Sequence, residues 1–201
     1  MAHIQEISPL WYYIRADGTI AEDIDQKALE LAREKNIKVI PLVVFAANRS
    51  SIILIEPAAR QRVVQDLIRI MHENGYDGIN IDMEIVKYAG GDYAPEKNGL
   101  TQFIGELGEE MKPLGKRLDV CLMPPVQPPV NLTPIYDYGA LCGLVDRAVI
   151  MAYDRHRGGD PARPWYTLAL GGGQHRGHSG SGIPAPAAVL GNPRLWLRLT
   201  P

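Results

Sequence analysis

Short apolar runs alternate with amphipathic segments through the first 155 residues of the 201-residue chain. Most of the runs have the length of strands and are rich in β-branched or aromatic residues. They predict strands over residues 7–14, 37–45, 77–84, 118–123 and 145–153. The segments between them repeat apolar residues at helical spacing, which predicts helices over residues 24–35, 58–72, 98–111 and 134–142. Strands that are apolar on both faces and alternate with helices indicate a parallel sheet with right-handed crossovers.

Two architectures are built from such a sheet, an eight-stranded β/α barrel and an open doubly wound sheet. No glycine-rich phosphate loop follows a predicted strand, which argues against a nucleotide-binding open sheet. Polar residues gather where strands end, with Asp82 and Glu84 on one strand and Tyr153 and Asp154 on another. Barrel enzymes hold their chemistry at that edge. We therefore expect a (β/α)8 TIM-barrel arrangement in which five strands are recognisable.

The segment 77–84, Asp-Gly-Ile-Asn-Ile-Asp-Met-Glu, carries the strongest candidate chemistry. Alternate side chains of a strand point to one face, so Asn80, Asp82 and Glu84 form a row, with Asp77 near its start. Two carboxyls that close cannot both ionise cheaply, so one pKa rises, which suits a general acid near neutral pH. Glu84, last in the row, is the predicted proton donor. A purely structural acidic strand is the alternative interpretation.

Composition and charge argue against several classes of partner and of segment. The formal net charge of −2 suggests neither a nucleic-acid nor an anionic membrane partner. No stretch approaches the ~20 apolar residues of a membrane span. The first residues lack a basic region followed by an apolar run, so no signal peptide is visible and the localisation stays open. Cys121 and Cys142 lie in apolar segments and are expected to be buried thiols.

Two motifs carry a resemblance to glycoside hydrolase family 18, which includes chitinases. Segment 77–84 resembles the family's strand-four signature Asp-Gly-x-Asp-x-Asp-x-Glu, with Asn80 in place of the middle Asp. An Asn at this position resembles the bacterial spore-cortex-lytic N-acetylglucosaminidases, and the segment 7–12 resembles the same branch. Residues 151–154, Met-Ala-Tyr-Asp, resemble the family's strand-six motif. The resemblance covers roughly residues 4–157 and implies an incomplete (β/α)8 barrel with approximately strands two to six.

The resemblance implies hydrolysis of β-linked N-acetylglucosamine polymers, with spore cortex peptidoglycan ahead of chitin. The implied mechanism is retaining and substrate-assisted, so the substrate's own 2-acetamido carbonyl is the nucleophile. Glu84 would protonate the glycosidic oxygen. Asp82 would orient the acetamido group, and Tyr153 would hydrogen-bond its carbonyl oxygen. Asp77 and Asn80 would support Asp82.

The resemblance also places residues around the sugar. Met151 and Asp154 would line the floor of the subsite, and Met123 ends a neighbouring predicted strand. Trp11 is a candidate for stacking on a sugar face, with core packing as the alternative. The implied partner is a polysaccharide that contains N-acetylglucosamine, and the mechanism calls for no metal and no cofactor. A non-catalytic sugar-binding relative and an inactive fragment are the alternatives. Further candidate contacts are Tyr88, Tyr93 and His156.

The composition changes sharply after about residue 155. Residues 156–201 contain no Lys, no Glu and one acid, Asp160, whereas the first 155 residues hold the other 22 acids. We predict a partial catalytic barrel over residues 1–155 and an irregular Gly/Pro/Arg-rich tail over residues 156–201. Our hypothesis is that the reading frame is lost between about residues 155 and 167, which resequencing the gene tests. A genuine flexible tail is the alternative. An incomplete barrel with open strand edges is expected to be unstable or inactive.

Overall fold

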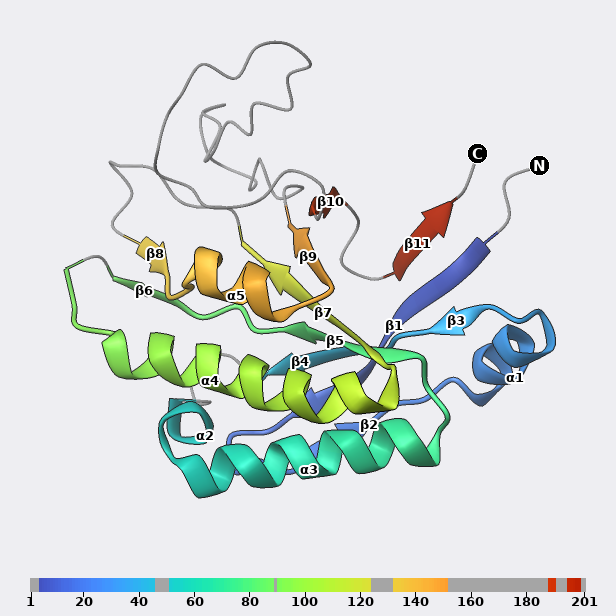
Figure 1. Cartoon of the computed structure of the whole chain (residues 1–201), viewed down its shortest axis with the longest axis horizontal. Coiled ribbons are helices and arrows are strands. Elements are labelled where there is room, and N and C mark those ends of the chain that lie inside the picture. Colours follow the sequence, from blue (N-terminus) through green and yellow to red (C-terminus); the bar gives the residue numbers. More distant parts are fainter. Residues whose placement is uncertain are drawn as a thin grey trace, which may run out of the picture.

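The computed structural model describes residues 4–45, 51–88, 90–123, 132–151, 188–190 and 195–199. The strands form one main sheet and a small two-stranded sheet (Figure 1). They are β1 (Ile4–Ile14), β2 (Ile20–Glu22), β3 (Lys38–Val39), β4 (Leu42–Phe45), β5 (Gly78–Asp82), β6 (Val86–Tyr88), β7 (Arg117–Leu122), β8 (Leu132–Pro134), β9 (Arg147–Ile150), β10 (Ala188–Leu190) and β11 (Leu195–Leu199). The helices are α1 (Gln26–Glu34), α2 (Ser51–Ile55), α3 (Pro57–Glu73), α4 (Ala94–Met111), the 3-10 turn η1 (Lys112–Leu114) and α5 (Tyr138–Leu144).

Five parallel strands form the centre of the main sheet, in the order β1-β4-β5-β7-β9. Each new strand is therefore added on the same side of the one before it. A doubly wound sheet reverses direction at a switch point, whereas a β/α barrel does not. The described strands follow an open path from β10 to β11 rather than a closed ring. The prediction of an incomplete (β/α)8 barrel is confirmed.

The two edges of the sheet are covered by strands from the segment predicted as an irregular tail. β10 pairs in parallel with β9, and β11 pairs antiparallel with β1 (Figure 1). Their sequences, Ala-Val-Leu and Leu-Trp-Leu-Arg-Leu, are short apolar runs of the kind that fits a strand. Open sheet edges present unpaired backbone groups that such runs can satisfy. The described residues of the tail are thus extended, and the domain boundary near residue 155 stays a prediction.

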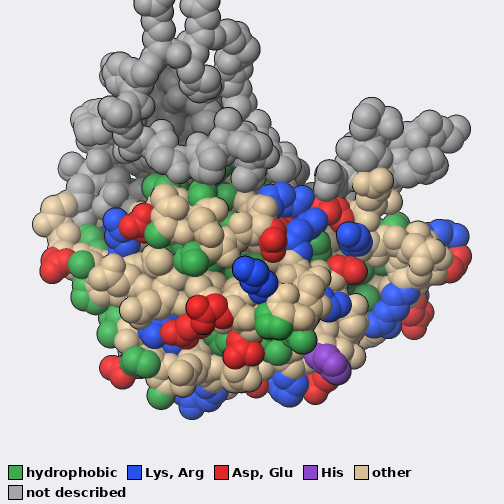
Figure 2. Space-filling model, viewed as in Figure 1, with side chains coloured by type: hydrophobic (Ala, Val, Ile, Leu, Met, Phe, Trp, Pro, Cys, Tyr) green, Lys and Arg blue, Asp and Glu red, His purple; other side chains and the backbone are tan. Residues whose placement is uncertain are grey.

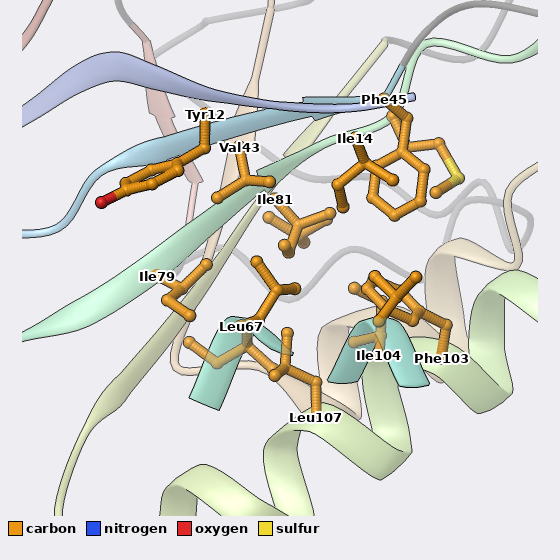
Figure 3. Close-up of a cluster of buried hydrophobic side chains, with 14 of the residues drawn as sticks. Tyr12, Ile14, Val43, Phe45, Leu67, Ile79, Ile81, Phe103, Ile104 and Leu107 are labelled. Carbon is orange, nitrogen blue, oxygen red and sulfur yellow. The ribbon is translucent and has the colours of Figure 1, made fainter. Parts of the chain in front are cut away.

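Helices α3 and α4 lie side by side along one face of the sheet (Figure 1). Figure 3 shows Ile79 and Ile81 of β5 meeting Leu67 of α3 and Ile104 and Leu107 of α4. All five side chains are at most 1% exposed. This contact fixes the odd-numbered residues of β5 on the helix side. The even-numbered residues consequently lie on the opposite face, which we call the inner face.

Two predicted elements are shorter than the pattern suggested. The strand over 37–45 is divided into β3 and β4 around Ile40 and Pro41, because proline lacks the N–H that a strand interior donates. The helix over 134–142 begins only at Tyr138. Its N-cap is Asp137, whose carboxylate accepts a hydrogen bond from the Ala140 N–H. The residues before it form β8, which pairs antiparallel with β6.

Gly78 explains why a glycine follows Asp77 in the acidic segment. A Cβ at position 78 would lie 2.2 Å from the carbonyl oxygen of Arg117, which is backbone and cannot move aside. Gly78 and Arg117 are also partners in the parallel pairing of β5 with β7. Only glycine therefore permits this approach of the two strands at the start of β5.

The amino-terminal end of the inner face holds a closed ring of ion pairs. Arg117 reaches Glu6 at 2.8 Å and Asp119 at 3.0 Å, while Arg147 reaches Glu6 at 2.6 Å and also bonds Asp119. Burial raises the pKa of Glu6, but hydrogen bonds from both guanidinium groups outweigh that effect and lower the pKa to about 2. The ring joins β1, β7 and β9 across the sheet.

The surface is mixed in charge on the face drawn in Figure 2, where acidic and basic side chains are interspersed over α4 and its surroundings. None of the helices in the described ranges combines the length and apolar character that a bilayer crossing requires. Both cysteines are free. Cys121 is buried as predicted, whereas Cys142 is only half-buried.

Candidate active site

Glu84 sits on a tight turn immediately after β5. The Ile85 N–H donates to the Met83 carbonyl at 3.1 Å, which closes a three-residue turn with Glu84 at its centre. Met83 and Ile85 are 1% and 2% exposed, whereas Glu84 is exposed. The two buried neighbours therefore hold the turn against the core, and Glu84 is presented beyond the carboxyl end of the central strand. This is the edge where barrel enzymes carry their reactive groups.

Asp82, two residues before Glu84, is the group with the perturbed titration. Its side chain is 7% exposed, and within the described residues its Oδ1 atom has no hydrogen-bond partner. Burial, and after it the charge of Glu84, raise the pKa of Asp82 to about 7. The sequence predicted that two close carboxyls separate in pKa. The raised pKa belongs to the buried carboxyl of this pair, since burial is its main cause.

Asn80 occupies the inner face one step further down β5. Its amide nitrogen donates to the Ser8 hydroxyl at 3.1 Å, and its carbonyl oxygen accepts from the Cys121 thiol at 3.4 Å. All three side chains are at most 2% exposed. A neutral amide satisfies both neighbours without adding a second buried charge beneath Asp82.

Asp77 lies at the opposite end of β5 from Asp82. Its carboxylate accepts a hydrogen bond from the Val39 N–H at 2.9 Å, which ties the start of β5 to β3. Five residues of extended chain separate it from Asp82, roughly 16 Å. Asp146 makes the same kind of bond to the Leu118 N–H at the start of β7, also at 2.9 Å. The support that Asp77 provides is therefore to the sheet, and not a direct contact with Asp82.

Trp11 is a core residue, which corrects its assignment as a sugar-stacking candidate. Its side chain is 4% exposed and its ring centroid lies 6.2 Å from that of Tyr76, within the main hydrophobic core. Its neighbour Tyr12 lies in the same core, although strict alternation would place the two side chains on opposite faces. The pairing of β1 with β4 shifts between Leu10 and Tyr12, and this irregularity in the strand lets both side chains pack in the core.

Met123 and Met151 are brought together on the inner face. They share a small apolar cluster with Leu42, Cys121 and Val149. The strands β7 and β9 that precede the two methionines are direct neighbours in the sheet. The structure thus groups the two predicted subsite methionines, and their contact with a sugar stays a prediction.

Several other predicted residues fall outside the described ranges. Tyr153, Asp154 and His156 are among them, and the side chain of Tyr88 is not described either. Tyr93 is half-buried, and its ring lies 5.8 Å from the Lys87 ammonium, a cation–π distance. None of the described ranges brings together three His, Cys, Asp or Glu side chains that could hold a metal ion.

Tyr136 and Tyr138 are the site residues that the sequence did not reveal. The Tyr136 hydroxyl donates to the Met83 carbonyl at 2.6 Å, and the Tyr138 hydroxyl donates to the Met123 carbonyl at 2.9 Å. The only local signal is a pair of tyrosines flanking the helix N-cap Asp137. That signal says nothing of Met83, which is 53 residues away in the chain.

The titration of Asp82 predicts how stability depends on pH. An aspartate in the unfolded chain titrates near 3.8, and the folded pKa is about 7. Between these values the folded protein retains a proton that the unfolded chain has lost, so this group lowers stability as pH rises through the window. Asp82→Asn removes that loss. Relative to wild type, we expect the variant to gain about 2–4 kcal/mol at pH 8 compared with pH 4.

Urea unfolding of both proteins at pH 4 and pH 8 measures this gain. Asp23→Asn, at an exposed site, is the control and is expected to show the same difference from wild type at both pH values. A difference between Asp82→Asn and wild type that does not change with pH contradicts the prediction.

The fold and the site together define a class before any comparison is made. A singly wound parallel β/α sheet with two carboxyls at the carboxyl end of its central strand is the arrangement of a β/α-barrel enzyme. The sequence profile of Glycosyl hydrolases family 18 matches residues 16–179. The chain belongs to that family. The matched range also runs past residue 155, the predicted boundary between barrel and tail.

Three relatives illustrate the similarity. YdhD of Bacillus subtilis (strain 168), which carries the provisional name sporulation-specific glycosylase, is 26% identical over 165 residues, 79% of this chain and 38% of YdhD. Its crystal structure superposes with a TM-score of 0.66 over 78% of this chain and 52% of that one, at 23% identity.

The C-terminal domain of a provisionally named chitinase from Desulfitobacterium hafniense DCB-2 gives a TM-score of 0.67 at 27% identity, over 76% of this chain and 47% of that one. The spore cortex-lytic enzyme SleL of Bacillus megaterium QM B1551 gives 0.63 at 15% identity, over 79% and 37%. The chain thus spans about half, or less, of the length of these relatives.

Proposed function

We propose that the protein is a glycoside hydrolase of β-linked N-acetylglucosamine polymers that uses Glu84 as its acid and base. The observation that carries this proposal is the arrangement of two carboxyls at the end of β5. Glu84 is exposed on a held turn, and Asp82 is buried beside it with a pKa of about 7. Family membership supports the reaction class. One exposed and one buried carboxyl suit different roles in acid–base catalysis.

The proposed reaction is retaining and substrate-assisted. Glu84 protonates the glycosidic oxygen as the bond to the anomeric carbon breaks, and the 2-acetamido carbonyl oxygen attacks that carbon to form an oxazolinium ion. Asp82, which is ionised above its pKa of about 7, accepts a hydrogen bond from the acetamido N–H and offsets the positive charge. Tyr153 donates to the acetamido oxygen. A water molecule then attacks the anomeric carbon and opens the oxazolinium ring. Glu84, now ionised, takes a proton from that water, which regenerates the acid.

The remaining predicted residues act around these groups. Asn80, fixed by Ser8 and Cys121, supports the inner face beneath Asp82. Met123 and Met151, which share an apolar cluster, line the floor of the sugar subsite together with Asp154. No second nucleophilic carboxylate is needed, because the substrate supplies the nucleophile.

Spore cortex peptidoglycan is the first substrate to test and chitin the second. The names of the relatives support both, since they include a sporulation-specific glycosylase, a spore cortex-lytic enzyme and a chitinase. Asn80, in the position where most of the family resembled here has Asp, favours the spore-cortex branch.

The experiment that tests the mechanism compares two matched chromogenic substrates. One is an aryl β-glycoside of an N-acetylglucosamine oligomer, and the other is the same compound without its acetyl groups. The full chain is expected to turn over the first at least about 10³-fold faster, because the second lacks the intramolecular nucleophile. The first product formed is expected to be the β-anomer by proton NMR.

Each other outcome rejects part of the proposal. Comparable turnover of both substrates, or an α-anomeric product, rejects the substrate-assisted mechanism. Sugar binding measured by calorimetry without turnover rejects the hydrolase in favour of a sugar-binding relative. Neither binding nor turnover rejects both functions for this chain.

A further inference from the structure

The turn that carries Glu84 is held from one side by a short segment that follows β8. Two consecutive residues of that segment bond the two backbone carbonyls that flank Glu84. The Tyr136 hydroxyl donates to the Met83 carbonyl at 2.6 Å, and the Ile135 N–H donates to the Ile85 carbonyl at 3.3 Å. A three-residue turn closed by its own single hydrogen bond is weakly held. These two contacts supply the missing constraint.

Tyr136 is itself well fixed. Its side chain is 5% exposed, and its ring packs edge to face on Tyr138 with centroids 5.5 Å apart. The Tyr138 hydroxyl in turn donates to the Met123 carbonyl at 2.9 Å. The two packed tyrosines therefore link the exit of β7 to the exit of β5. A buried side chain held in this way can fix the position of the carbonyl that it bonds.

We propose that Tyr136 is a positioning residue for Glu84, acting through the Met83 carbonyl to fix where the carboxyl of the turn lies relative to Asp82. This inference rests on the proposed function for its catalytic consequence. Its structural content, the distance between the two carboxyls, stands independently. The nearness of Tyr136 to both acids agrees with it, because after burial the charges of Asp82 and Glu84 contribute to raising the tyrosine pKa.

The position of Glu84 matters because its carboxyl is proposed to transfer a proton to the glycosidic oxygen in the transition state. A displacement of about 1 Å at a reacting group can cost about 10²-fold in rate. Among the described residues, loss of the Tyr136 hydroxyl leaves the Met83 carbonyl with the hydrogen bond from the Ile85 N–H, so the turn is held less firmly at this end. Bound substrate contacts other residues of the subsite, so binding is affected less than turnover.

The first test is kinetic and compares two hydroxyl deletions. Tyr136→Phe is expected to lower kcat by about 10- to 100-fold and to change KM by less than about threefold. Tyr12→Phe is the matched control, because its buried hydroxyl bonds Tyr76 at 2.9 Å on the helix side of the sheet. Both variants are expected to lose similar thermal stability, and only Tyr136→Phe to lose kcat. Equal kcat in the two variants overturns the proposal.

The second test needs no turnover and reads the carboxyl pair directly. The pKa of Asp82 is measured by carbon-13 NMR of the labelled carboxyl, in wild type and in Glu84→Gln. Removing the neighbouring charge is expected to lower the pKa of Asp82, since the charge of Glu84 contributes to raising it. In the Tyr136→Phe background the same Glu84→Gln change is expected to lower it by less. An identical shift in the two backgrounds overturns the proposal.

The two tests separate two failures. A wild-type chain that turns over no substrate, but whose carboxyl coupling depends on Tyr136, refutes the proposed function and supports the positioning role. Turnover that is insensitive to Tyr136→Phe, together with unchanged coupling, refutes the positioning role and leaves the function intact.

Discussion

Glu84→Gln is expected to lower kcat by about 10³-fold and to leave sugar binding nearly unchanged. Glutamine has the shape of glutamate but no acidic proton to transfer, so only the acid–base step is lost. General acid–base catalysis is worth about 10²–10⁴-fold. Binding depends on the remaining groups of the subsite, so calorimetric affinity for an N-acetylglucosamine oligomer stays within a few fold of wild type. Steady-state kinetics on the same oligomer measure the fall in kcat.

The leaving group makes this prediction more specific. A nitrophenolate departs without much help from an acid, whereas a sugar alkoxide requires protonation. The loss in Glu84→Gln is therefore expected to be smaller with the aryl glycoside than with the oligosaccharide. Glu110→Gln, exposed on α4, is the control and should retain wild-type kcat. Full activity of Glu84→Gln on the oligosaccharide contradicts the assigned role of Glu84.

Arg147→Met is expected to destabilise the fold by about 3–5 kcal/mol at pH 7. Arg147 closes the ring of ion pairs by bonding both Glu6 and Asp119, and Asp119 is 0% exposed. Methionine fills a similar volume but carries no charge. Two buried carboxylates are then left to share Arg117, and an incompletely paired buried charge is costly. Urea unfolding monitored by circular dichroism measures the loss.

The control for this variant is Arg69→Met on α3. Arg69 also pairs with two carboxylates, Asp66 and Glu73, each at 3.1 Å, but its side chain is 55% exposed. Solvent screening limits such pairs, so a loss below about 1 kcal/mol is expected. Because both variants replace an arginine by methionine, the difference between their losses measures the effect of burial on the ion pairs. Similar losses in the two variants would show that the ring contributes no more than an exposed pair.

The ring of ion pairs also predicts how stability changes at acidic pH. The pKa of Glu6 is lowered to about 2 in the folded chain, from 4.5. Its contribution to stability is therefore present above pH 4.5 and is lost as pH falls toward 2. Wild type is expected to lose more stability than Arg147→Met across that window, because the variant has already lost one of the two guanidiniums that lower the pKa.

The pattern of apolar residues was enough to predict the elements that make up the barrel sheet. Five strands and the helices between them lie close to their predicted positions, because burial on both faces requires apolar runs that the sequence displays directly. Pro41 marked the one strand that is interrupted. The short pieces β2, β6, β8 and α2 were not predicted, since three to five residues carry too little periodicity to recognise.

The candidate site divides in the same way. Alternation along residues 78–84 predicted that Asn80 and Asp82 share a face, and the structure places both opposite the helices. Alternation could not place Trp11, because the pairing of β1 with β4 shifts between Leu10 and Tyr12 and both Trp11 and Tyr12 lie in the core. The two interpretations of Trp11 therefore stayed open until the pairing of β1 with its neighbour was known.

The sequence by itself indicated the family and the strand that carries the two carboxyls, and it led to the proposal that Glu84 is the acid. These features follow from the local residue pattern and from the motif, and both lie within a few consecutive residues of the chain. Only the tertiary structure decided that Asp82 has the raised pKa, that Asp77 fastens the sheet, and that Tyr136 holds the turn of Glu84. Burial and hydrogen bonding between segments 38 to 53 residues apart set these properties. Such contacts exist only once the strands and helices have packed.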